Sequence, residues 1–168
     1  MVVVDSGLPE TAVAGASAIS ADASTIIGSY NTNPLAVHNL PAQFRATADG
    51  MSGLWSPQWG DVTPGSALAA NDDGSRIVGY IFYYLSYASL WTPELGVLDL
   101  NAWLPANGLA IDGWSLLSAN GISANGDAIV GTGYYYDDTM TEAEWRLFLI
   151  TGVNASMPIF VDGFESHP

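Results

Sequence analysis

The chain contains no cysteine and no lysine, and it has only two histidines, His38 and His167. Without cysteine it can form neither disulfides nor thiolate metal sites, and it has no cysteine nucleophile. No Gly-x-Ser-x-Gly sequence accompanies the histidines, which argues against a Ser-His-Asp catalytic arrangement. No apolar run is long enough to span a bilayer, and the N-terminus lacks the basic and apolar regions of a signal peptide. We therefore predict no catalytic residues and no transmembrane segment.

Positive charge is also scarce, with three arginines against 17 carboxylates and a net charge of −14. Nucleic acids and anionic membranes are bound through cationic side chains, so we expect neither as a partner. Such an acidic surface is typical of a soluble protein in an extracellular setting. Without a signal peptide the chain either stays inside the cell or lacks its exported N-terminal part. We predict the latter, with an extracellular or cell-surface location, and a glycan or a protein as the candidate partner.

Glycine-terminated apolar pairs recur three times, as Ile26-Ile27-Gly28, Ile77-Val78-Gly79 and Ile129-Val130-Gly131. Their spacing of about 51 residues indicates one supersecondary unit used repeatedly. An Asp/Asn-Gly or Asp-Ala dipeptide precedes each pair, which predicts a hairpin with both turn residues at positive φ. In the first copy Ala23 replaces the glycine, so we expect that turn to be strained or of another type.

Further short β-segments follow each hairpin, and each ends at a threonine before a turn. A fourth strand follows in the first two copies but is not found in the third. We predict an all-β fold of three four-stranded repeats, most simply the blades of a β-propeller. Three blades are too few to close a propeller, so a β-trefoil or β-prism is the alternative. A short helical turn is expected at residues 100–104, before Pro105.

The predicted organisation is a single β-repeat domain, residues 1–153, followed by a C-terminal tail, residues 154–168. The repeat units cover residues 12–55, 65–105 and 114–153. The strand at residues 2–5 belongs to a preceding unit or closes the ring. If the chain is complete, a homo-oligomer would supply further blades.

At its repeated alanine, Asp/Asn-Gly and Ile-Val-Gly positions, the chain resembles the HAF-repeat proteins of bacteria over roughly residues 12–153. Residues 98–105, Gly113-Trp114 and residues 118–122 are similar to the last unit of that family. The resemblance implies a truncated member of an extracellular repeat family and no particular chemistry, because the shared residues belong to turns and core. The tail from Ile159 to Ser166 is similar to a short C-terminal motif of exported gammaproteobacterial proteins; an edge strand or a disordered end is the other interpretation.

Tyrosines and carboxylates are most concentrated in the long loop of the third unit. Aromatic faces and carboxylates suit glycan binding, and clustered carboxylates would also suit Ca²⁺. A solvated acidic turn with tyrosines packed on the sheet is the simpler interpretation. The candidate ligand-binding residues are Tyr134, Tyr135, Tyr136, Asp137, Asp138, Glu142 and Glu144.

Other motifs predict structure rather than chemistry. Residues 71–75 resemble the start of a calcium loop, but Phe82 stands where an EF-hand requires glutamate. Asp22, Asp73 and Asp127 are therefore interpreted as turn formers, with no cofactor expected. We favour a non-enzymatic extracellular or surface scaffold, either purely structural or serving as a ligand-binding module. The alternative is an acidic carbohydrate-active enzyme or a lectin-like domain.

Overall fold

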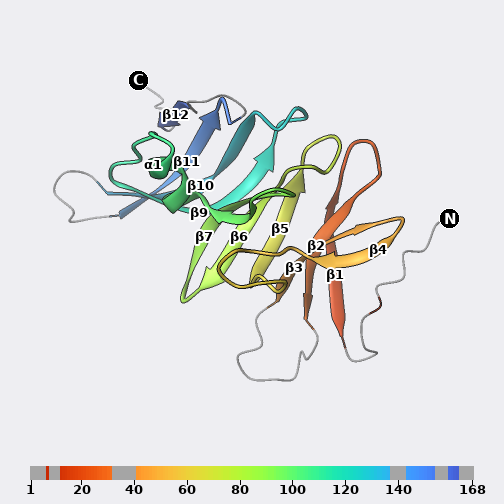
Figure 1. Ribbon diagram of the computed structural model, residues 1–168. Coiled ribbons are helices and arrows are strands. Elements are labelled where there is room, and N and C mark those ends of the chain that lie inside the picture. The colour runs from red at the N-terminus through yellow and green to blue at the C-terminus, as the bar shows by residue number, and fades with distance from the viewer. Residues whose placement is uncertain (1–6, 8–11, 32–40, 137–142, 154–158, 163–168) are drawn as a thin grey trace.

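The computed structural model describes residue 7, residues 12–31, 41–136 and 143–153, and the backbone of residues 159–162. The predicted all-β class is confirmed, because the described residues form three antiparallel sheets and one short helix. The sheets follow one another in chain order and lie side by side (Figure 1). Within the described residues, no helix is long and apolar enough to cross a membrane.

Each sheet contains four strands that pair in the order in which the chain forms them. The first sheet consists of β1 (Val13–Ile19), β2 (Ile26–Asn31), β3 (Ala42–Thr47) and β4 (Gly50–Gly53). The second consists of β5 (Gly65–Ala70), β6 (Ile77–Tyr83), β7 (Leu85–Thr92) and β8 (Gly96–Asp99). The third consists of β9 (Trp114–Ile122), β10 (Ala128–Tyr136), β11 (Ala143–Thr151) and β12 (Ile159–Asp162).

The third sheet corrects one prediction, because it does contain a fourth strand. β12 pairs with β11 through Phe160 opposite Ile150 and Val161 opposite Leu149. It lies inside the segment assigned to a tail, for which an edge strand was one interpretation, and it occupies the sheet edge that residues 2–5 would complete if they closed the ring. Residues 2–5 themselves lie outside the described part of the chain.

The expected short helix is present as α1 (Leu100–Ala106), immediately after β8. The Asp99 side chain caps it by accepting a hydrogen bond from the backbone N–H of Asn101 at 2.8 Å. The helix runs one residue past Pro105, farther than its sequence predicted. Leu100 and Leu104 are fully buried, so the helix closes one end of the core beside the second sheet.

Two hydrophobic clusters join consecutive sheets. Ile27 of the first sheet packs with Ala67 and Ile77 of the second. On the opposite face of the second sheet, Val78 packs with residues of the third sheet that include Ile129. These two faces follow from strand alternation, which sends neighbouring residues 77 and 78 to opposite sides. The second sheet is therefore covered on both faces.

The repeated glycines are explained by a β-bulge at the same place in every sheet. Ser17, Leu68 and Asn120 are each left out of the register between β1 and β2, β5 and β6, and β9 and β10. The bulge brings a backbone carbonyl against the glycine of the neighbouring strand, where an added Cβ would collide with Gly15, Ser66 or Ser118. A side chain is thus excluded at Gly28, Gly79 and Gly131.

The loops that follow β1, β5 and β9 share one conformation, which differs from the predicted two-residue turn. Each loop has a single residue in the left-handed region: Ala23 at φ 59°, Gly74 at 66° and Gly126 at 73°. The preceding Asp or Asn is not left-handed, so the prediction that both turn residues have positive φ is wrong. The strain expected at Ala23 is present, because an alanine is held in the left-handed region, where glycine is favoured.

Side-chain oxygens of the loops replace missing backbone partners. In each copy, the side chain of the first loop residue accepts a hydrogen bond from the backbone N–H of the residue five positions later, at 2.9–3.0 Å. The pairs are Ser20 with Thr25, Asn71 with Arg76 and Ser123 with Ala128. The Oδ1 atom of the third residue accepts from the N–H two residues later: Asp22 from Ser24, Asp73 from Ser75 and Asn125 from Asp127. The interpretation of these acidic residues as turn formers therefore holds for Asp22 and Asp73.

The three loops also contact one another in a row. The N–H of Asp22 donates to the carbonyl of Asp72 at 3.0 Å, and the N–H of Asp72 donates to the carbonyl of Ala124 at 2.9 Å. The guanidinium of Arg76 donates to the carbonyl of Gly126 at 3.1 Å. The repeats are therefore linked by polar contacts between loops as well as by the two apolar clusters.

Candidate functional site

The predicted ligand-binding cluster lies at the end of the third sheet, and the structure divides it between two faces. Tyr134, Tyr135 and Tyr136 end β10, and Glu144 lies opposite Tyr135 on β11. Alternation places Tyr134 and Tyr136 on one face and Tyr135 on the other. Asp137, Asp138 and Glu142 lie outside the described residues.

Three aromatic side chains, Tyr134, Tyr136 and Trp145, share one face of the third sheet; we call them the aromatic group. The ring centroids of Tyr134 and Trp145 are 4.4 Å apart, and those of Tyr134 and Tyr136 are 6.5 Å apart. Trp145 is 64% exposed, although an indole ring is mostly apolar. The two tyrosines were predicted as candidates from the sequence and Trp145 was not, because it joins them only through the pairing of β10 with β11.

The opposite face carries a separate set of contacts around Tyr135. The guanidinium carbon of Arg146 lies 4.2 Å from the centroid of the Tyr135 ring, within the range of a cation–π interaction. Arg146 also forms an ion pair with Glu144 at 2.9 Å, and the Trp114 ring lies 5.6 Å from the Tyr135 ring. Glu144 is thus paired with a cation and separated from the aromatic group by the thickness of the sheet.

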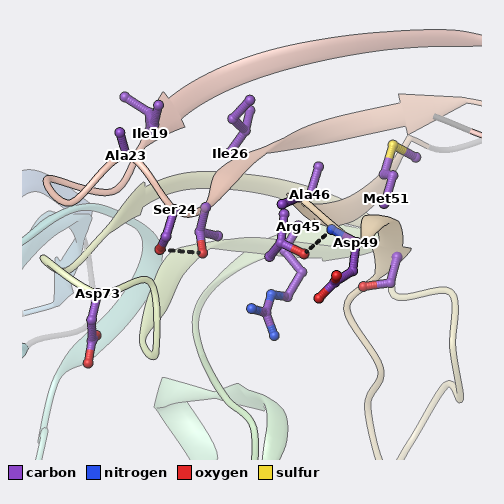
Figure 2. A pocket seen from close by; sticks show the side chains of 14 residues that line it. Ile19, Ala23, Ser24, Ile26, Arg45, Ala46, Asp49, Met51 and Asp73 are labelled. Carbon is purple, nitrogen blue, oxygen red and sulfur yellow. Dashed lines mark hydrogen bonds between the residues drawn. The ribbon is translucent and has the colours of Figure 1, made fainter. Parts of the chain in front are cut away.

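A cleft of about 860 Å³ opens at the other end of the molecule, in the first sheet (Figure 2). The loop from Ala23 to Ile26 lines one side, and the turn between β3 and β4 lines the other. Within this turn, the N–H of Asp49 donates to the Thr47 hydroxyl at 3.3 Å. Asp73 of the second loop completes the lining. The cleft therefore belongs to the first repeat, and the second repeat contributes only Asp73 to its lining.

Arg45 is the cation of this cleft, and sequence reasoning did not select it. Its guanidinium carbon lies 5.2 Å from the centroid of the Trp91 ring on the second sheet. Nε of Arg45 and Nε1 of Trp91 are buried, and neither has a hydrogen-bond partner among the described residues. The sequence offers one indication of its importance, which is that Arg45 is one of only three cationic side chains in a very acidic chain. The contact across sheets could not be predicted from a single sequence.

The carboxylates near the loops are held by hydroxyl groups. Hydrogen bonds from Ser20 and Ser24 lower the pKa of Asp22, and those from Ser75 lower the pKa of Asp73. The Ser20 and Ser75 hydroxyls lie 2.6 Å from the carboxylates that they contact. Among the described residues, no group of three or more His, Asp or Glu side chains is arranged to hold a metal ion.

Comparison of the chain with protein-family models, with curated proteins and with solved structures gives no match. The geometry of the described residues gives two candidate sites, the aromatic group and the Arg45 cleft.

Proposed function

We propose that this chain is a non-enzymatic β-repeat scaffold built from propeller-like blades. The proposal rests on the structural roles of the repeated residues. The shared glycines accommodate a bulge, the Asp and Asn side chains shape the loops, and Ile27 and Val78 pack one sheet on the next. Repetition that serves neighbour-to-neighbour packing is the property of repeat architectures.

The packing favours blades over a closed threefold fold. Within the described residues, one hydrophobic cluster joins the first and second sheets and the other joins the second and third. A trefoil or prism would also need a core shared by its first and third units. We further propose that the chain belongs with the HAF-repeat proteins and acts outside the cell or on its surface.

The scaffold proposal is tested against the enzyme alternative by incubating the chain with a panel of polysaccharides and measuring released reducing ends. We expect no release above a buffer control. Release that disappears in an Asp138→Ala, Glu142→Ala double variant with an unchanged melting temperature would establish the enzyme instead. The location is tested by immunodetection on intact cells and in the medium of the source organism, where detection only inside the cells would contradict it.

Glycan binding is a second candidate function, favoured by the exposure of Trp145 beside two tyrosines. Stacked aromatic rings offer a large apolar surface at small conformational cost. A glycan array should lose its signal with Trp145→Ala and keep it with Trp55→Ala, a tryptophan that is 36% exposed on another part of the surface. Equal binding by both variants, or no binding by the unaltered chain, would remove this candidate.

A further inference from the structure

One apolar position that is buried in the first and second sheets is exposed to solvent in the third, which is the last sheet of the row. Ile27 and Val78 occupy the same place in the first and second sheets, and both are 0% exposed. Val130 occupies that place in the third sheet and is 46% exposed. The first two are covered by the sheet that follows them in the chain. Val130 therefore lies where a following sheet would pack.

The neighbouring strand of the third sheet shows the same difference. Leu147 lies opposite Thr132 on β11, in the place that Ala88 holds on β7. Ala88 is 0% exposed, whereas Leu147 is 60% exposed. Leu149 pairs with Val130 and completes the apolar surface, although it is half-buried. We call Val130, Leu147 and Leu149 the outer face of the third sheet.

The first sheet has a partly uncovered surface of the complementary kind. Phe44 and Ala46 of β3 lie on the same face and are buried, so the exposed part of this face lies along β1. Ala67 and Ala119 are 0% exposed, because each faces the sheet that precedes it, whereas the equivalent Ala16 is exposed. Ile19 is 55% exposed and pairs with the half-buried Ile26. We call Ala16, Ile19 and Ile26 the outer face of the first sheet. Ile19 and Ile26 also line the cleft of Figure 2.

We propose that the two outer faces bind each other between two copies of this chain. Inside one chain, Ile27 packs on Ala67 and Ile77, and Val78 packs on Ala119 and Ile129. Val130 of one copy would continue this series by packing on Ala16 and Ile26 of the other. Because the two faces differ, the contact is head-to-tail, and two copies that use both ends close a ring of six sheets. Six blades fall within the range of known propellers. The inference rests on the proposed blade arrangement.

Charge makes the association depend on salt in a predictable direction. Each copy carries a net charge of −14, so two copies repel one another at low ionic strength. The residues that define the two outer faces are all apolar. Added salt should therefore strengthen the dimer by screening the repulsion between the two copies. A contact built on ion pairs would instead be weakened by added salt.

The experiment is a mixing test that uses one variant for each end. Val130→Asp places a charge in the outer face of the third sheet, and Ile19→Asp does so in the first sheet. Both side chains are exposed in the single chain, so the folded monomer should survive both changes. Leu95→Asp is the matched control, since Leu95 is 47% exposed in the turn between β7 and β8. The readout is the solution mass by light scattering over a dilution series, with a thermal melt of each sample.

We expect a dimer for the unaltered chain and for Leu95→Asp, and a dissociation constant raised at least about tenfold for each end variant. In a head-to-tail dimer, the mixture of Val130→Asp with Ile19→Asp retains one undamaged contact, so the mixture should associate better than either variant alone. Dimers of Ile19→Asp as strong as those of the unaltered chain would mean that third sheets pair with each other, and would overturn the proposal. A monomeric chain with a cooperative melt would also overturn it, while leaving the scaffold proposal intact.

Discussion

The second and third sheets are built alike, yet they meet solvent differently. Both have a bulged first hairpin, a left-handed glycine in the loop and a glycine that receives a backbone carbonyl. Val78 is nevertheless 0% exposed and Val130 is 46% exposed. The difference shows that the burial of a repeat position is set by its neighbour in the row, whereas the conformation of the repeat is set by its own residues.

The largest difference in stability should come from placing an aspartate at Val78 and, separately, at Val130. Val78→Asp buries an unpaired carboxylate between two sheets and should lower the free energy of unfolding by about 3 kcal/mol or more. Val130→Asp leaves the carboxylate in water and should change the stability of the monomer by less than about 0.5 kcal/mol. Urea denaturation at a concentration where the chain is monomeric measures both. Equal losses would show that the outer face of the third sheet is covered within the chain.

A smaller effect is expected where one loop contacts the next. An added Cβ at Gly74 would lie 2.5 Å from Oγ1 and 2.6 Å from Cβ of Thr25, in the preceding loop. Gly74→Ala should therefore cost about 2 kcal/mol, from the left-handed φ together with the collision. Gly108→Ala is the matched control, because Gly108 has φ 86° and open space around it. The difference between the two losses in urea denaturation measures the contact between loops, and equal losses would mean that the loops are independent.

The loops also differ in their response to acid, because the first two use aspartate where the third uses Asn125. The pKa values of Asp22 and Asp73 are lowered from 3.8, so both carboxylates stabilise the folded state while they are ionised. This stabilisation is present above the unfolded pKa and is lost as the pH falls through the folded pKa.

The Asp22→Asn, Asp73→Asn double variant keeps the Oδ1 acceptor, as Asn125 does, but cannot titrate. Its melting temperature should fall less than that of the unaltered chain between about pH 6 and about pH 3. Parallel declines in melting temperature would assign the acid sensitivity to other carboxylates.

The sequence was sufficient for features that depend on residues close together, and insufficient for features that depend on packing between sheets. The period, the all-β class and the special role of Ala23 follow from local residue types. The loop conformation was missed because an Asp-Gly pair such as Asp73-Gly74 suits both a two-residue turn and a longer loop. Asn71 decides between them by accepting a hydrogen bond from the N–H of Arg76.

Contacts between segments far apart in the chain were beyond sequence reasoning. An edge strand was one of two interpretations of the tail, and β12 confirms it, but its pairing with β11 is not encoded in the repeat period. Arg45 meets Trp91 only after two sheets pack together. Trp145 joins the tyrosines only through the register of β10 with β11. Of the aromatic group, sequence reasoning thus selected the two tyrosines only.

The smallest expected effect is a gain in stability, and it comes from the first of the three loops. Ala23 holds a φ of 59° where the other two loops have glycine. Ala23→Gly should raise the free energy of unfolding by about 0.5 kcal/mol, since relief of the left-handed strain exceeds the added flexibility of the unfolded chain. Ala21→Gly, two residues earlier in the same loop and without positive φ, adds the flexibility alone and should lower the stability by a similar amount. Opposite signs in urea denaturation would show that the first loop has the conformation of the others at a local cost, whereas a loss in both variants would mean that the alanine is not strained.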